Sequence, residues 1–319
     1  MNFEGKSLFF IGDSITANGS FVSLLRGYFR KNSRKISVFN KGIPGASAAI
    51  AYEALGEALS VFTPDIGVIS LGVNDVGYWE YTSSPELTSD ERRTKQERQD
   101  LFIRGIARLA ELLTEKGVCP IICSPFCVSR FLSGVKEIET EVDSREKNSI
   151  KSSFYTREAF AKINDSLGEY AGLLRKYAEA RGFEFWDLFS ETFCGVNEDC
   201  FRADGIHYSA AGDKLIADLI ARKISGNACS AYEASAELEK IAELEAAERA
   251  YYFVKYNIMR NTSAGLSDSE LLDAVSVWLK KNGNINGLNE AREAGFFKFV
   301  IGNREKQRKL TELILGEKI

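Results

Sequence analysis

The chain of 319 residues contains a single histidine, His207. This residue limits the possible catalytic mechanisms more than any other. A serine or cysteine nucleophile near neutral pH needs an imidazole to take its proton, because its own hydroxyl or thiol stays mostly protonated. Any such mechanism here must run through His207. Asp204 stands three residues earlier, and along a turn its carboxylate can reach the ring Nδ1 and leave Nε2 free to accept a proton. A histidine with a nearby loop aspartate and no catalytic role is the alternative.

The first candidate nucleophile is Ser14, in the tripeptide Gly12-Asp13-Ser14. It follows an apolar run and precedes a helical pattern, so its hydroxyl can lie near backbone N–H groups and the positive end of a helix dipole. A serine that only caps a helix would occupy the same place in the sequence. The tripeptide by itself does not decide between these two interpretations.

Two further residues could bind an oxyanion. Asn74, in Gly-Val-Asn-Asp, offers a side-chain amide, and Gly45 ends the loop Asn-Lys-Gly-Ile-Pro-Gly that begins at Asn40. A glycine lets its backbone N–H approach an anion with no side chain in the way. Both residue types are also common in plain turns, which is the alternative for each.

The elements that must position these residues alternate between strands and helices. Short apolar runs predict strands at 7–12, 35–39, 65–71, 118–124 and 183–187, and helical patterns predict helices at 20–30, 47–60, 97–116, 155–181 and 209–223. Residues 126–153 have no firm period and are predicted to be a long insertion. Such alternation implies right-handed crossovers and a parallel sheet covered on both faces. Sites in these sheets form at the carboxyl ends of the strands, where all the candidates should converge.

Four blocks of sequence occur in order at these strand ends: Phe-Ile-Gly-Asp-Ser-Ile-Thr at 10–16, Asn-Lys-Gly-Ile-Pro-Gly at 40–45, Gly-Val-Asn-Asp at 72–75, and Asp-Gly-Ile-His-Tyr-Ser-Ala-Ala-Gly at 204–212. Together they resemble the SGNH hydrolase superfamily of GDSL-type esterases, over about residues 5–225. The resemblance implies a three-layer α/β/α sandwich around a central parallel sheet, similar to flavodoxin.

The resemblance also implies roles for the residues. Ser14 would be the nucleophile, His207 the base and Asp204 the acid that orients it. The oxyanion would be held by the backbone N–H groups of Ser14 and Gly45 and by the amide of Asn74, with Gly42 as a rival to Gly45. Asp13 would brace the turn and take no part in the triad.

The composition of the chain limits the classes of partner and cofactor that are expected. Forty-one basic and 45 acidic residues give a net charge of −4, which argues against a general nucleic-acid binder. No run of about 18 apolar residues appears, so no membrane span is expected. The start of the sequence does not read as a signal peptide, which favours a cytoplasmic protein. The six cysteines are expected to be reduced thiols, and their spacing fits no common zinc pattern. No metal and no cofactor is expected.

A boundary is expected near Ile224–Ala228, which divides the chain into a catalytic domain at 1–226 and an α-helical module at 230–319. The module is predicted to hold helices at 231–261, 267–281 and 288–316 and to supply no triad group. Its first helix carries an apolar stripe, made up of Leu238, Ile241, Leu244, Ala247 and Tyr251 or Tyr252. This stripe must pack within the chain, on a second subunit or on another protein.

The predicted activity is that of a serine esterase acting through an acyl-enzyme on a small acyl ester, with acetyl favoured and a carbohydrate as the suggested carrier. Tyr78 and Trp79 follow Asn74 and could stack on a sugar, although they could equally fill space under a loop. A thioesterase, a lysophospholipase or an acyltransferase would use the same site. A non-catalytic interaction protein is the alternative of a different class.

Overall fold

The core of the molecule is a five-stranded, fully parallel sheet. The computed structural model describes residues 1–32, 34–81, 94–131, 156–229, 235–253 and 304–316. The strands are β1 (Ser7–Gly12), β2 (Ser37–Gly42), β3 (Ile66–Ser70), β4 (Cys119–Cys123) and β5 (Glu184–Trp186). They lie in the order β2-β1-β3-β4-β5, so the predicted parallel sheet is confirmed.

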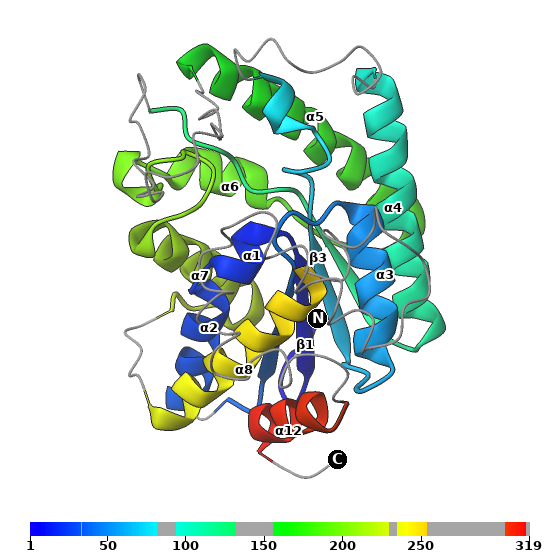
Figure 1. Ribbon diagram of the computed structural model, residues 1–319, viewed down its shortest axis with the longest axis vertical. Helices are drawn as coiled ribbons and strands as arrows, with labels where there is room; N and C mark the ends of the chain where they lie inside the picture. The colour runs from blue at the N-terminus through cyan, green and yellow to red at the C-terminus, as the bar shows by residue number, and fades with distance from the viewer. Residues whose placement is uncertain (33, 82–93, 132–155, 230–234, 254–303, 317–319) are drawn as a thin grey trace, which may run out of the picture.

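Helices cover both faces of this sheet, as the near-continuous apolar strands require. Every residue of β1 and of β3 is buried. The helices α3 (Ala48–Leu59), α4 (Lys95–Glu115) and α5 (Arg157–Arg181) form one layer, and α2 (Phe21–Lys31) and α7 (Ala210–Ser225) form the other (Figure 1). The predicted three-layer α/β/α sandwich is therefore confirmed.

The strand order places a switch point between β1 and β3. The chain leaves β1 toward one edge of the sheet and returns to continue from β3 toward the other, which opens a crevice at their carboxyl ends. The helix α1 (Ser14–Asn18) begins directly after β1, and the short helix η1 (Tyr78–Tyr81) follows β3. Two more short elements, α6 (Leu188–Gly195) and η3 (Glu198–Cys200), lead to the loop that carries Asp204 and His207.

The second strand differs from its predicted range. It was expected at 35–39 with a loop from Asn40, but β2 runs to Gly42 and its last residues pair with Ile11 and Gly12 of β1. The polar residues Asn40 and Lys41 hid this extension, because their partners come from a distant part of the sequence. Most of the insertion predicted at 126–153, from residue 132 onward, and the predicted helix at 267–281 lie outside the described residues.

Two helices of the C-terminal region are described, α8 (Ala236–Phe253) and α12 (Arg304–Leu315). From the expected apolar stripe of α8, Leu238, Ile241, Leu244 and Tyr252 are buried, and they join the same hydrophobic core as the sheet. These side chains therefore pack within the chain. Whether residues 230–319 form a module of their own stays a prediction. Across the described part of the chain, no helix is both long enough and apolar enough to span a bilayer.

Candidate active site

Ser14 is the first residue of α1, and a neighbour carries out the capping that a serine could have done. The N-cap is Asp13, whose carboxylate accepts a hydrogen bond of 2.9 Å from the backbone N–H of Ile15. The capping explanation for Ser14 is therefore wrong, and the bracing role predicted for Asp13 is what its geometry provides. The hydroxyl of Ser14 is left to make other contacts.

That hydroxyl lies 2.9 Å from Nε2 of His207, a residue 193 positions away in the sequence. The other ring nitrogen, Nδ1, lies 2.7 Å from Oδ2 of Asp204. The three groups form the Ser-His-Asp sequence of hydrogen bonds that passes a proton from a hydroxyl to an imidazole while a carboxylate orients the ring. The side chains of His207 and Asp204 are 26% and 31% exposed, so the group opens to solvent.

The surroundings of Asp204 favour the ionised form of its carboxylate. Burial by itself would raise its pKa, but the hydrogen bonds from the ring and backbone of His207 and from the backbone of Ile206 outweigh burial. The pKa of Asp204 consequently lies below its ordinary value. An ionised Asp204 favours the Nδ1–H tautomer of His207, which leaves Nε2 able to accept a proton from the hydroxyl of Ser14.

The structure distinguishes the two rival oxyanion glycines. Gly42 ends β2, and its backbone N–H already donates to Oδ1 of Asn40 at 3.0 Å. A Cβ at Gly42 would come within 2.3 Å of the backbone nitrogen of Ala17, so close packing against α1 explains this glycine. Gly45 is exposed and has a φ of 74°, a conformation that favours glycine. Gly45 is therefore the better candidate for an N–H that faces a ligand.

Asn74 joins the site from the loop after β3. Its side-chain nitrogen donates to the carbonyl of Ala46 at 3.0 Å. A primary amide carries two hydrogens, so one of them remains for an oxyanion. The next residue, Asp75, accepts a hydrogen bond of 3.0 Å from the N–H of Ala48 through Oδ1. These two bonds fasten the loop after β3 to the loop that contains Gly45.

Two acids beside these loops carry shifted pKa values. Burial raises the pKa of Asp13 to about 6, although the hydrogen bond from Ile15 and the charge of His207 oppose the shift. Burial, together with the charge of Asp13, raises the pKa of Asp75 to about 7. Oδ2 of Asp75 is buried and has no hydrogen-bond partner among the described residues. With a pKa of about 7, Asp75 keeps its proton in mildly acidic solution and loses it as the pH rises through neutrality.

The aromatic residues after Asn74 separate into two environments. Burial raises the pKa of Tyr78, and the charges of Asp13 and Asp204 add to the shift. The hydroxyl of Tyr81 instead lies 2.9 Å from that of Ser166 on α5. The side chain of Trp79 lies outside the part of the chain that the structure describes.

One wall of the site comes from the start of the insertion that was predicted at 126–153 and expected to border the cleft. After β4, the N–H of Ser129 donates to the carbonyl of Gly205 at 2.7 Å, and the carbonyl of Cys127 accepts from the hydroxyl of Tyr208 at 2.7 Å. The first residues of the predicted insertion are therefore a buried strap against the His207 loop. Beyond them, the exposed guanidinium of Arg130 lies over the rings of Phe131 and Phe193. A buried apolar stretch that follows a strand end was the available signal.

Comparison with known proteins agrees with this geometry. Residues 8–220 match the family model of the GDSL-like lipases and acylhydrolases. No curated protein matches the chain significantly. Among solved structures, an acetylxylan esterase from Geobacillus stearothermophilus is 20% identical with a TM-score of 0.50, over 70% of this chain and 97% of that one.

A gut microbial diltiazem-metabolizing enzyme is 21% identical with a TM-score of 0.55, over 71% of this chain. The match covers only 48% of that larger protein. At these identities the two structures establish the fold alone, whereas the family model spans most of the described α/β region. The chain therefore belongs to the GDSL-like lipase/acylhydrolase family, and it is a serine ester hydrolase.

Proposed function

We propose that the protein hydrolyses a small acyl ester, with acetyl preferred, by a two-step mechanism that uses Ser14, His207 and Asp204. The observation that carries the proposal is the hydrogen bond of 2.9 Å between the hydroxyl of Ser14 and Nε2 of His207, with Asp204 2.7 Å from Nδ1. This arrangement also argues against a non-catalytic interaction protein, which needs no such alignment.

In the first step Oγ of Ser14 attacks the ester carbonyl while Nε2 of His207 takes the hydroxyl proton. The resulting oxyanion is held by the backbone N–H groups of Ser14 and Gly45 and by the amide of Asn74. The C–O bond to the leaving alcohol then breaks, and the imidazolium of His207 gives its proton to that alcohol. Water repeats the sequence on the acyl-enzyme, which releases the acid and restores Ser14.

The preference for a small acyl group is supported by the surroundings of Ser14. The residues around Ser14 are polar, since its hydroxyl contacts His207 and Asp204 lies behind that ring. Asp13 caps the helix that Ser14 begins. Such a region suits an acetyl group better than a long alkyl chain. The structural similarity to an acetylxylan esterase suggests an acetylated carbohydrate as the carrier, with Tyr78 and Trp79 as its stacking surfaces.

The cellular location belongs to the same proposal. Buried Cys123, Cys127 and Cys200 are free thiols. Thiols persist in reducing compartments, so we place the protein in the cytoplasm.

A substrate panel tests the proposal. The full chain should hydrolyse p-nitrophenyl acetate faster than the octanoate ester, and it should release acetate from an acetylated xylooligosaccharide. A fluorophosphonate should label the native chain once, and Ser14→Ala should be neither labelled nor active. Labelling of Ser14→Ala at the native rate would remove Ser14 as the nucleophile. Faster turnover of an acyl-thioester or a lysophospholipid, or transfer to an added sugar in preference to water, would replace the acetylesterase assignment.

A further inference from the structure

The outer side of β2 is completed by two charged side chains instead of a strand. β2 is the edge strand beyond β1. The carbonyl of Val38 accepts from Nε and Nη2 of Arg26 at 3.1 and 2.9 Å, and the N–H of Asn40 donates to Oε1 of Glu245 at 3.0 Å. In a parallel sheet, one residue of a neighbouring strand donates to such a carbonyl and accepts from the N–H two residues later. The pair of Arg26 and Glu245 takes the place of that residue.

This pair joins α2 to α8 in the interior of the protein. Nη2 of Arg26 lies 2.6 Å from Oε1 of Glu245, and the two side chains are only 2% and 3% exposed. A buried ion pair is stable only when its geometry is good and further hydrogen bonds satisfy both groups. The short distance between Arg26 and Glu245 meets the first condition, and the hydrogen bonds of both side chains to the backbone of β2 meet the second. The position of α8 relative to β2 is therefore set at Glu245.

The residue that Glu245 holds is also the one that ties β2 to the nucleophile helix. Nδ2 of Asn40 donates to the carbonyl of Thr16 at 2.9 Å, and Oδ1 of Asn40 accepts from the N–H of Gly42 at 3.0 Å. Thr16 lies in α1, two residues after Ser14. A shift of Asn40 would consequently move both α1 and the start of the loop that leads to Gly45.

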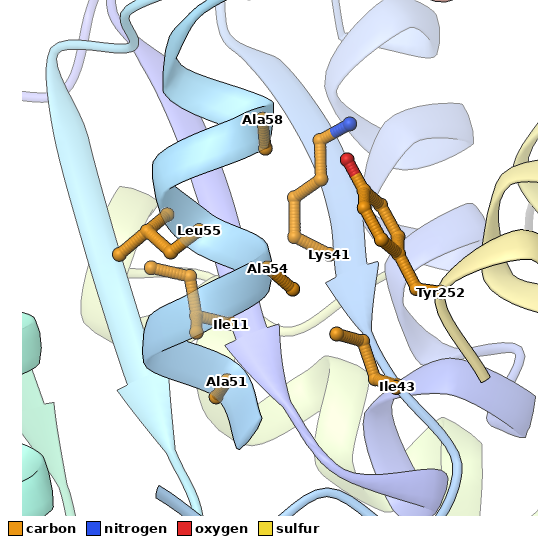
Figure 2. A pocket seen from close by; sticks show the side chains of 8 residues that line it. All are labelled: Ile11, Lys41, Ile43, Ala51, Ala54, Leu55, Ala58 and Tyr252. Carbon is orange, nitrogen blue, oxygen red and sulfur yellow. The ribbon is translucent and has the colours of Figure 1, made fainter. Parts of the chain in front are cut away.

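Two further turns of α8 contact the same segment. Both oxygens of Glu248 accept from Nζ of Lys41, at 2.7 and 2.8 Å. Tyr252 closes a cavity of about 10 Å³ that Ile43 also lines, across from Ala54 and Ala58 of α3 (Figure 2). Such a cavity holds at most about one water molecule. Glu245, Glu248 and Tyr252 share one face of the helix, and this face follows the chain from Asn40 to Ile43.

We propose that Glu245 is a positioning residue for ester hydrolysis: through Asn40 it fixes the loop of Gly45 and the helix of Ser14 in their reactive arrangement. The proposal rests on the function proposed above for Ser14 and Gly45. It gives α8, which lies outside the residues that match the family model, a direct part in the geometry of the oxyanion site.

The test is Glu245→Gln in the full chain, assayed with p-nitrophenyl acetate. The amide keeps the size of the side chain but loses its negative charge. If its Oε1 keeps the bonds to Asn40 and to Nη2 of Arg26, its N–H₂ group faces Nη1 of Arg26, which is also a donor. Because small displacements of reacting groups are costly, kcat should fall ~10-fold while KM stays within about twofold. The shape of the pH dependence should not change, since Ser14, His207 and Asp204 keep their contacts.

Two variants of the same helix serve as controls. Ile241→Ala empties a fully buried position of α8 and should lower the Tm with kcat within about twofold of the native value. Glu237→Gln removes an exposed ion pair with Arg30 and should change neither quantity. If Glu245→Gln keeps its kcat, or if Ile241→Ala loses as much kcat as Glu245→Gln does, the positioning role is wrong.

Two outcomes remain to be separated. If Glu245→Gln is unfolded at the assay temperature, Glu248→Gln decides: a fall in kcat with unchanged KM supports control of the loop by α8, and native kcat overturns it. Ser14→Ala distinguishes the two proposals. Activity in Ser14→Ala contradicts the proposed function itself, whereas an inactive Ser14→Ala beside a fully active Glu245→Gln contradicts only the role of Glu245.

Discussion

The side chain of Asn74 and the carbonyl of Ala46 are joined by a hydrogen bond of 3.0 Å that fixes the direction of the amide. With one hydrogen held there, the second points away from Ala46 in the plane of the amide group. A donor whose orientation is fixed in advance is what the proposed oxyanion role of Asn74 requires, because a preorganised donor lowers a barrier without reorganising when charge develops.

Asn74→Ala should lower kcat by about 10²–10³-fold and leave KM within a few-fold, because the lost donor acts on charge that exists only in the transition state. Steady-state kinetics with p-nitrophenyl acetate measure both constants. A change confined to KM would make Asn74 a residue that positions substrate or shapes the turn.

Asp204→Asn should reduce kcat by about 10³–10⁴-fold, since the amide no longer stabilises the imidazolium and can favour the wrong tautomer of His207. Asp199→Asn, in the preceding turn of the same region, is the matched control and should retain native kinetics. Retention of most activity in Asp204→Asn would assign the orientation of His207 to another group.

Relative to the native chain, the Asp75→Asn variant should become more stable as the pH rises. The folded protein holds the proton of Asp75 up to a pKa of about 7, well above the ordinary value of 3.8. The resulting stabilisation is complete below about pH 4 and is lost as the pH rises through 7. The uncharged amide does not lose it, so between pH 5 and pH 8 the free energy of unfolding of Asp75→Asn should gain about 2–3 kcal/mol on that of the native chain. Urea unfolding at the two pH values measures this difference, and a constant difference would show that Asp75 is ionised throughout.

Arg26→Met should lower the free energy of unfolding by about 3–5 kcal/mol, because it removes the cation that contacts the buried carboxylate of Glu245 and leaves only the more distant charge of Arg249. Arg30→Met is the comparison one turn away, where the partner Glu237 is exposed, and it should cost no more than about 1 kcal/mol. Denaturant unfolding of the two variants gives the contrast. Equal costs would indicate that Glu245 reaches water in the folded protein.

The sequence was a good guide to the site because each catalytic candidate directly follows a strand or lies in one short turn. The apolar strands fixed where the sheet had to be, and the parallel topology then brought Ser14 and His207 to one end of it. The sequence could not decide which of several neighbouring groups makes a given hydrogen bond. Only the geometry shows that Asp13 caps α1 and frees Ser14, and that Asn40 occupies the N–H of Gly42.

The parts that sequence reasoning missed depend on partners far away in the chain. Asn40 and Lys41 read as loop residues because their polar side chains break an apolar run, yet Glu245 and Glu248 satisfy them more than 200 positions later. The strap at Cys127–Ser129 has no period of its own, since its backbone bonds go to the His207 loop. Periodicity reports local burial, and it contains no information about hydrogen bonds of this range.

The completion of β2 by a late helix has a consequence for the biogenesis of the protein. During synthesis residues 1–225, which contain the five strands and the Ser-His-Asp group, can emerge and fold before Glu245 has left the ribosome. In that interval the outward N–H of Asn40 on β2 lacks the acceptor that Glu245 later supplies, and an incompletely covered strand edge is a template for pairing with other chains. The nascent chain is therefore most prone to aggregation, and most in need of a chaperone, in the period between the emergence of α7 and the docking of α8.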